Sequence, residues 1–190
     1  MSTLDFGPTT RVLADLVRGV RDDQLEDRTP CAGRSVADTL DHIAGLSLAF
    51  TAAARKEPIP GGGNPTADGS NLPDGWRDVI AGRLAALAEA WRDPTAYAGT
   101  TQAGPIEMPA EEAALVALDE VTVHAWDLAV ATGQEYDADP AAVEACAQFV
   151  AGFEGPRDGS LFGPPVAVPE AASALEKLIG ATGRDPAWTP

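Results

Sequence analysis

Three side chains that could do metal chemistry lie close together in LDEVTVHAWDLA, residues 118–129: Glu120, His124 and Asp127. Around them, from Ala113 to Ala131, most residues are apolar or small, and the span contains no lysine or arginine. Burying an unpaired carboxylate in such surroundings costs several kcal/mol or forces it to take up a proton. The span therefore predicts that Glu120 faces a polar partner or a cation inside the protein.

The spacing of these residues places them on one side of a helix. Residues four apart project from the same face of a helix, one turn apart, so Glu120 and His124 share a face and Asp127 continues it. The only other histidine, His42, lies in another predicted helix, and Asp38 is the only charged residue near it on its own side. We therefore expect the His42 imidazole to point inward as well.

Two inward-pointing imidazoles and a carboxylate suit one divalent cation. A His₂Glu set with a water in the fourth position is an open zinc site, and helix bundles build metal sites from Glu and His on facing helices. The simpler interpretation, a hydrogen-bonded core histidine, is the stronger one for His42 taken alone. The joint pattern indicates a metal held by His42, Glu120 and His124. For Asp127, a direct ligand and a residue that positions a ligand both stay open.

Six helices separated by Gly/Pro-rich loops are expected to position these groups. Apolar periodicity and capping residues predict them at about residues 9–21, 35–54, 74–92, 109–133, 140–153 and from 173 onward. The first is expected to start from a Thr9/Thr10 cap, and Ser35 with Asp38 resembles a capping box. The loop 56–73 is long, and its glycines predict mobility at its centre. Residues 97–108 could hold a short strand pair.

The predicted fold class is all-α, a four-helix bundle with short extra C-terminal helices. The predicted helix at 109–133 is apolar nearly all round, so we expect it at the centre of the bundle. A length of 190 residues supports one well-buried core, and residues 1–190 are predicted to form a single domain.

The composition restricts the possible partners. Thirteen basic and twenty-nine acidic residues give a net charge of −16, which repels nucleic acids and anionic membrane surfaces. No apolar run approaches the roughly 20 residues of a membrane span, and the first residues lack the features of a signal peptide. Two cysteines are too few for a disulfide scaffold. We expect a cytoplasmic protein with a small-molecule substrate, no nucleic-acid or membrane partner, and a homodimer as one possible assembly.

Two motifs carry a family resemblance. TPCAGRSVADTLDHIAG (29–45) and LDEVTVHAWDLAVATG (118–133) resemble the metal-binding domain of the mycothiol-dependent maleylpyruvate isomerase family, within the DinB-like bundles. The closing FGPPVAVPEAASAL…GRDPAWTP is similar to a single-domain actinobacterial branch of that family. The resemblance covers most of the chain. It implies a four-helix bundle with a divalent metal, usually zinc, bound by residues that correspond to His42, Glu120 and His124.

The sequence departs from the family pattern at two points. Arg34 stands where a tryptophan is common after the PCAG motif, which could alter the entrance of the site. The isomerase also has a second, C-terminal domain that supplies groups for substrate handling, and we expect no counterpart of it in this sequence. The resemblance is therefore not taken to imply the isomerase reaction itself.

The function expected from residues and resemblance together is thiol-dependent. A bound metal can lower the pKa of a coordinated thiol or activate a water, and the family context favours a low-molecular-weight thiol, such as mycothiol, that attacks a small electrophile in a transferase or isomerase reaction. Zinc is the expected metal, with Ni²⁺, Fe²⁺ and Mn²⁺ as alternatives. Two alternatives stay open. One is a hydrolase that uses metal-bound water, with Asp127 or Asp38 as its base, and the other is a non-catalytic small-molecule-binding bundle with a structural metal.

The candidate site residues are His42, Glu120 and His124 as metal ligands, Asp127 as a catalytic residue, and Thr39 and Asp38 as substrate-binding residues.

Overall fold

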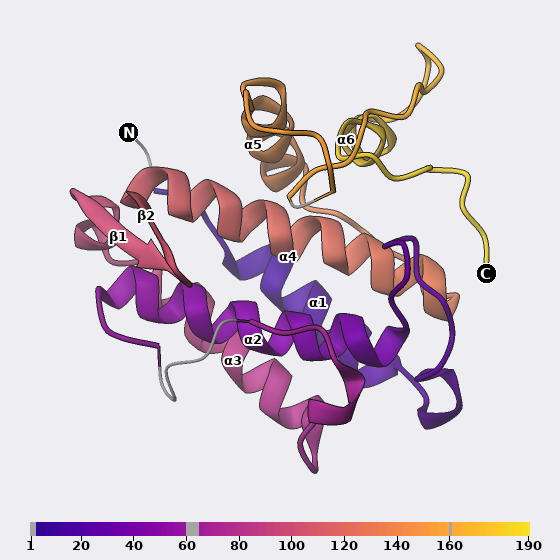
Figure 1. Ribbon diagram of the computed structural model, residues 1–190, viewed down its shortest axis with the longest axis horizontal. Coiled ribbons are helices and arrows are strands. Elements are labelled where there is room, and N and C mark those ends of the chain that lie inside the picture. The colour runs from indigo at the N-terminus through magenta and orange to yellow at the C-terminus, as the bar shows by residue number, and fades with distance from the viewer. Residues whose placement is uncertain (1–2, 60–64, 160) are drawn as a thin grey trace.

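The computed structural model describes residues 3–59, 65–159 and 161–190, and the regular secondary structure of these residues is helical apart from one small sheet (Figure 1). The α-helices are α1 (Gly7–Gly19), α2 (Val36–Arg55), α3 (Trp76–Ala90), α4 (Ala110–Thr132), α5 (Pro140–Ala151) and α6 (Ala174–Ala181). Short 3₁₀ helices lie at Asp22–Gln24, Gly69–Asn71 and Pro94–Tyr97, and a two-stranded antiparallel sheet consists of β1 (Thr100–Ala103) and β2 (Ile106–Pro109).

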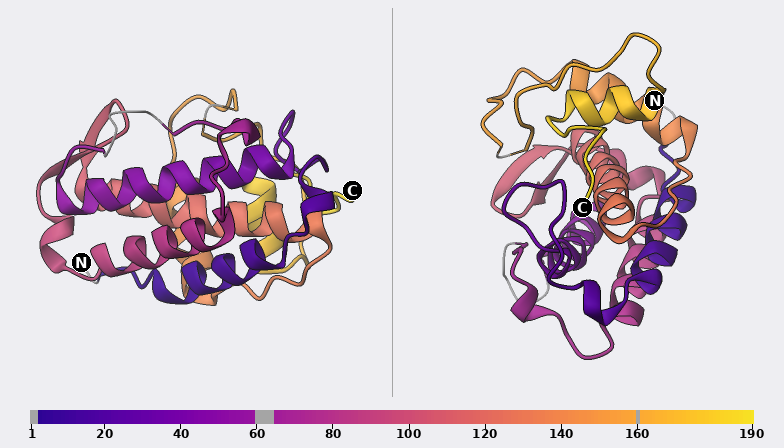
Figure 2. Two further views of the ribbon diagram at one scale, coloured as in Figure 1. Left: turned by 90° about the horizontal axis from the view of Figure 1, so that it is seen from below. Right: turned by 90° about the vertical axis from the view of Figure 1, so that its right-hand side faces the viewer.

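The four long helices α1 to α4 form the bundle that the sequence predicts. Helix α3 packs against α1 and α2, while α4 packs against α1, α2 and α5 (Figure 2). Helices α5 and α6 lie beside each other on the side of α4 that faces away from α2 (Figure 1). The predicted all-α bundle with extra C-terminal helices is therefore confirmed. None of the helices in the described part of the chain is both long and apolar enough to cross a membrane.

Helix α4 is the central element, as its apolar composition predicts. Side chains are buried around its whole circumference, and its ends are set by local signals in the sequence. The helix begins directly after Pro109. Glu111 and Glu112 lie in its first turn, where their negative charges interact favourably with the positive end of the helix dipole. It ends at Gly133, whose φ of 68° is the left-handed conformation that glycine adopts most easily.

The predicted capping box at the start of α2 is also confirmed. The Ser35 hydroxyl accepts a hydrogen bond from the Asp38 backbone N–H at 3.1 Å, and the Asp38 carboxylate accepts one from the Ser35 N–H at 2.9 Å. The other Asp38 oxygen accepts the Gly69 N–H at 2.8 Å. One carboxylate thus fixes both the first turn of α2 and the loop that returns to it.

Helix α1 differs from its prediction. It begins at Gly7, not at a Thr9/Thr10 cap, because Pro8 starts the helix with its fixed φ and Phe6 takes the capping position without a side-chain hydrogen bond. Both threonines are buried inside the helix, and the Thr10 hydroxyl donates to the Phe6 carbonyl at 2.9 Å.

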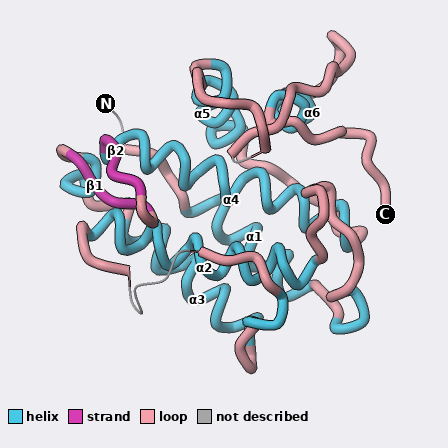
Figure 3. The backbone as a smooth tube through the Cα atoms, in the orientation of Figure 1, coloured by secondary structure: helices cyan, strands magenta, loops and turns pink. Residues whose placement is uncertain are grey.

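The predicted strand pair is present as the β1–β2 hairpin, which Figure 3 shows beside the first turn of α4. The hairpin is attached to the end of α2, because the Thr101 hydroxyl donates to the Ala53 carbonyl at 2.6 Å. In the predicted loop 56–73, the expectation of mobility falls on residues 60–64, which lie outside the described residues.

The double use of Asp38 predicts a pH-dependent contribution to stability. The backbone N–H groups of Ser35 and Gly69 hold the pKa of Asp38 below its ordinary value, so the ionised carboxylate stabilises the fold above a pH of about 4, and this contribution is lost as pH falls through the lowered folded-state pKa. Asp38→Asn should lower the free energy of unfolding by up to about 1 kcal/mol at pH 7, measured by urea denaturation.

The same measurement near pH 3 should show a smaller difference between Asp38→Asn and the parent protein. Asp74→Asn, in the exposed loop before α3, is the control and should change stability little at either pH. An equal loss for Asp38→Asn at both pH values would show that the charge of the carboxylate is not the cause.

Candidate metal centre

The three predicted ligands meet between α2 and α4. His42 comes from the middle of α2, and Glu120 and His124 come from successive turns of α4, which packs along α2. One oxygen of Glu120 lies 3.1 Å from His124 Nε2 and 3.5 Å from His42 Nε2. The two imidazole rings meet edge to face, with their centroids 5.0 Å apart.

These distances fit a single metal ion. One ligand atom from each residue lies within 4.8 Å of the other two. A tetrahedral zinc with bonds of about 2.0–2.2 Å holds its ligand atoms about 3.3–3.6 Å apart, close to the observed separations of Glu120 from the imidazoles. The arrangement therefore matches the donor set and the size that a divalent ion requires.

Hydrogen bonds behind the rings orient both imidazoles for metal binding. His42 Nδ1 lies 3.2 Å from the carbonyl oxygen of Thr66, and His124 Nδ1 lies 2.9 Å from a carboxylate oxygen of Asp127. Both partners are acceptors, so each Nδ1 donates its proton to its partner, and Nε2 of each ring faces Glu120. A protonated Nε2 donates to the Glu120 carboxylate, whereas an Nε2 that has lost its proton offers its lone pair to a metal ion. Metal-binding histidines commonly hold one ring nitrogen by such a hydrogen bond and bind the ion through the other.

Asp127 does not lie among the three ligand atoms but behind His124. Its side chain is 0% exposed, and it also accepts hydrogen bonds from Arg184 Nε at 2.8 and 3.0 Å. The structure thus places this carboxylate where it can hold and orient the His124 ring. Of the two interpretations that the sequence leaves open, the geometry corresponds to the positioning role.

Arg184 is the important site residue that the sequence analysis missed. It follows α6, which packs on α4 through contacts of Ile179 with Val123 and Trp126. After the helix, Gly183 has a φ of +95°, and the Arg184 N–H donates to the Ile179 carbonyl at 3.2 Å, as in a Schellman motif. A Cβ at Gly183 would lie 2.7 Å from a backbone atom of Gly163, so only glycine allows this turn.

A signal for such a partner was present in the sequence. Asp127 lies in a span without basic residues, so its burial requires a cation from elsewhere in the chain. The glycine that ends the last helix directly precedes Arg184, but nothing local shows that this turn reaches Asp127.

The charges of the centre are strongly coupled. Burial alone would raise the pKa of Glu120, but hydrogen bonds with His124 and His42 outweigh burial and hold it well below its ordinary value. Burial alone would lower the pKa of His124, but hydrogen bonds with Asp127 and Glu120 outweigh burial and raise it to about 10. Two carboxylates on either side of one imidazole therefore call for positive charge at this position, which a proton or a metal ion can supply.

Two of the three candidate ligands are partly accessible to solvent. The exposed fraction of the side chain is 23% for His42 and 18% for Glu120, but only 7% for His124. The two predicted substrate-binding residues lie one turn before His42. Thr39 is buried and its hydroxyl donates to the Ser35 carbonyl, while Asp38 binds two backbone N–H groups. Within the described ranges, neither side chain hydrogen-bonds to the three candidate ligands.

Comparison with known proteins identifies the family to which this centre belongs. The family model "Mycothiol maleylpyruvate isomerase N-terminal domain" matches residues 6–129, a range that contains His42, Glu120, His124 and Asp127. The chain belongs to this family. The mycothiol maleylpyruvate isomerase resemblance expected from the two motifs is thereby confirmed.

Two proteins of Mycobacterium tuberculosis are similar over nearly the whole length. The uncharacterized protein Rv0738 of strain ATCC 25618 / H37Rv and the uncharacterized protein MT0763 of strain CDC 1551 / Oshkosh are each 33% identical over 181 residues, which is 90% of this chain and 91% of theirs.

Solved structures of the mycothiol-dependent maleylpyruvate isomerase and of a single-substitution mutant show the same fold. They superpose with TM-scores of 0.57 and 0.58 at 18% and 17% sequence identity. The superposition covers 76% of this chain but 66% of theirs, slightly less than two thirds of the isomerase. The expected DinB-like helical fold is confirmed, and at this identity the likeness concerns the fold alone.

The Arg184–Asp127–His124 chain predicts that a residue remote from the metal ligands controls metal affinity. Arg184→Met should weaken zinc binding by about 10- to 100-fold, because the Asp127 carboxylate loses the partner that fixes it against His124. Affinity should be measured by competition with a chromogenic chelator, with circular dichroism to verify folding.

The matched control is Arg92→Met, which removes an exposed arginine that forms an ion pair with the exposed Glu89. It should leave zinc affinity unchanged. A folded Arg184→Met protein with the zinc affinity of the parent would show that Asp127 orients His124 without help from the C-terminal segment.

Proposed function

We propose that this protein is a metal-dependent enzyme that uses a low-molecular-weight thiol such as mycothiol to convert a small electrophilic substrate, in a transferase or isomerase reaction. The observation that carries the proposal is the convergence of two oriented Nε2 atoms, from His42 and His124, beside one Glu120 oxygen. Membership in a family named for mycothiol supports the thiol as the second reactant.

In this proposal the side chains of the centre have separate tasks. His42, Glu120 and His124 hold the ion, and Asp127 with Arg184 keeps the His124 ring in its orientation. A divalent ion held there lowers the pKa of a thiol that coordinates it, so that the thiol is deprotonated at neutral pH. Two neutral imidazoles and one carboxylate contribute a charge of only −1, which leaves the site attractive to an anionic sulfur.

The donor set favours zinc over the alternatives. Imidazole nitrogen with one carboxylate oxygen is a common zinc combination, and catalytic zinc sites typically take three protein ligands. Ni²⁺, Fe²⁺ and Mn²⁺ accept similar donors and stay alternatives. In the described part of the chain, no fourth His, Cys, Asp or Glu joins the group, which supports a position open to a thiol.

Two observations favour the thiol reaction over hydrolysis. A hydrolase would need a free carboxylate as its base, but Asp127 is shared between His124 and Arg184, and Asp38 is held by two backbone N–H groups. A non-catalytic bundle with a structural metal would be expected to close the site with a fourth protein ligand.

A cytoplasmic location is part of the proposal, because Cys31 and Cys146 are both unpaired, as in a reducing compartment.

The first consequence is metal content. Protein purified without an affinity tag should contain about one divalent ion per chain, and His42→Ala, Glu120→Ala and His124→Ala should each lose most of it, measured by elemental analysis. Glu112→Gln, an exposed residue on the same helix α4, is the control and should keep the ion. Undiminished metal in all three ligand variants would rule out this site.

The second consequence is thiol binding. In cobalt-substituted protein, mycothiol or a simple thiol should produce a sulfur-to-cobalt charge-transfer band in the near ultraviolet, and His124→Ala should show little or none of it. If the cobalt spectrum does not respond to thiols while the protein cleaves an ester or amide, the hydrolase interpretation replaces the proposal. If neither occurs, the non-catalytic bundle is the better description.

A further inference from the structure

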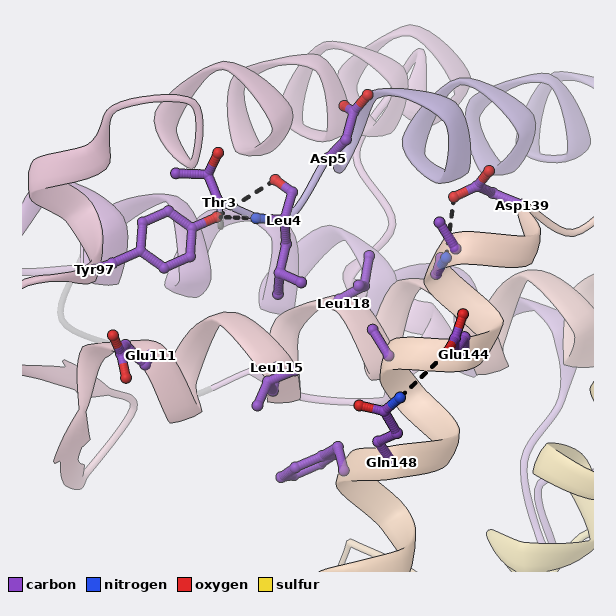
Figure 4. Close-up of a pocket in the computed structure, with 14 residues that line it drawn as sticks. Thr3, Leu4, Asp5, Tyr97, Glu111, Leu115, Leu118, Asp139, Glu144 and Gln148 are labelled. Atoms are coloured by element: carbon purple, nitrogen blue, oxygen red, sulfur yellow. Dashed lines mark hydrogen bonds between the residues drawn. The ribbon is translucent and has the colours of Figure 1, made fainter. Parts of the chain in front are cut away.

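A cavity of about 640 Å³ borders the first half of α4 (Figure 4). Its walls are the N-terminal segment before α1, the first half of α4, and α5. At 100° per residue, Leu115 and Leu118 project from the face of α4 roughly opposite to Glu120 and His124. The cavity is therefore separate from the proposed reaction site, and its volume lies in the range of small-molecule sites.

The floor of the cavity is apolar. Leu115 and Leu118 line it from α4, Phe149 from α5, and Leu4 from the N-terminal segment. Figure 4 shows Leu4, Leu115 and Leu118 around the space between the N-terminal segment and the two helices. Leu4, Leu115 and Phe149 are only partly buried, so a ligand that covered them would gain free energy from removing apolar surface from water.

The rim of the cavity carries charge of one sign. Asp5, Glu111, Asp139 and Glu144 all line it, and among the residues that the structure describes no lysine or arginine does. Asp5 and Asp139 each accept one backbone N–H, and Glu144 accepts one side-chain N–H, so these carboxylates keep unused lone pairs. Four carboxylates around an apolar floor make a site complementary to a cation.

Some of the hydrogen-bond donors beside the cavity are already used within the protein. The Tyr97 hydroxyl donates to the Leu4 carbonyl at 3.4 Å and accepts the Leu4 N–H at 3.0 Å, as Figure 4 shows. The Gln148 amide donates one N–H to Glu144 at 3.3 Å, and its carbonyl oxygen and second N–H stay available. With four carboxylates on the rim, acceptors outnumber the remaining donors, so a ligand that supplies donors fits the cavity best.

We propose that this cavity binds an organic cation, a small molecule with an apolar body and a protonated amine. The apolar body covers Leu115, Leu118 and Phe149, and the ammonium group donates to the carboxylates of the rim. The net charge of −16 attracts any cation to the surface of this protein, so recognition at the cavity must be tested by ligands that differ in charge alone and by variants that differ in position alone.

The probes are 4-phenylbutylamine, 4-phenylbutan-1-ol and 4-phenylbutyrate, which share one apolar body and are cationic, neutral and anionic at pH 7. Isothermal titration calorimetry should show saturable binding of the amine at one site per chain, at least about tenfold weaker binding of the alcohol, and none of the carboxylate. Raising the ionic strength should weaken binding of the amine more than binding of the alcohol.

Substitutions in and outside the cavity test whether the amine binds there. Glu111→Gln with Glu144→Gln should weaken amine binding by roughly two- to tenfold and leave alcohol binding unchanged, because each exposed carboxylate contributes a modest interaction. Glu170→Gln, far along the chain in the loop before α6, is the control and should bind the amine like the parent. Leu115→Trp should abolish binding of both ligands by filling the cavity. His42→Ala should bind the amine normally.

Each contrary result overturns the proposal. Equal affinity for amine and alcohol, or no saturable binding of the amine, means that the cavity does not recognise a cation. Loss of amine binding in His42→Ala with no effect of the two glutamate changes means that the amine binds at the metal centre. A dimer in sedimentation experiments that Leu115→Trp dissociates means that a second copy of the chain fills the cavity.

Discussion

The partly buried carboxylate of Glu120 is the constraint on which the rest of the centre depends. It carries negative charge between α2 and α4, in a bundle with a mainly apolar core, and it must be compensated there. His42 from α2 and His124 from α4 supply the compensation, so one side chain fixes how these two helices face each other. The position that satisfies Glu120 is also the position where a divalent ion would bind, because both requirements call for positive charge near the same oxygen.

Groups of opposite charge follow one another outward from Glu120. Behind His124 lies Asp127, and behind Asp127 lies Arg184, so each buried group has a partner of opposite charge or a hydrogen-bond donor. The family match covers residues 6–129, whereas Arg184 lies beyond it, in the turn after α6. The candidate ligands thus come from the part of the chain that defines the family, and the support for one of them comes from the C-terminal segment. If a metal ion is bound there as proposed, its affinity depends on the packing of α6 on α4.

Helix α4 contributes a polar face to the candidate metal centre and an apolar face to the cavity. On one face it presents Glu120 and His124 to α2, and on the other it presents Leu115 and Leu118 to a cavity under α5 and the N-terminal segment. A helix that is apolar nearly all round can do this because every side of it is covered by another element. The polar groups on such a helix are few, and Glu120, His124 and Asp127 each have a specific partner. The buried Asp119 differs from them, because one of its oxygens has no hydrogen-bond partner among the described residues and burial raises its pKa to about 8.

Local chemistry in the sequence determined the helices and the candidate ligands. Apolar periodicity, the Ser35–Asp38 box and Gly133 act over a few residues, and the spacing of Glu120 and His124 follows from one helical turn. Only the tertiary structure decided which groups meet across long stretches of chain: Thr66 lies 24 residues from His42, and Arg184 lies 57 residues from Asp127. Only the tertiary structure also showed that the Asp38 carboxylate accepts a hydrogen bond from the Gly69 N–H, 31 residues away, and none from the candidate ligands in the described part of the chain. Such contacts depend on the register of packed helices and on the path of loops, which no local pattern encodes.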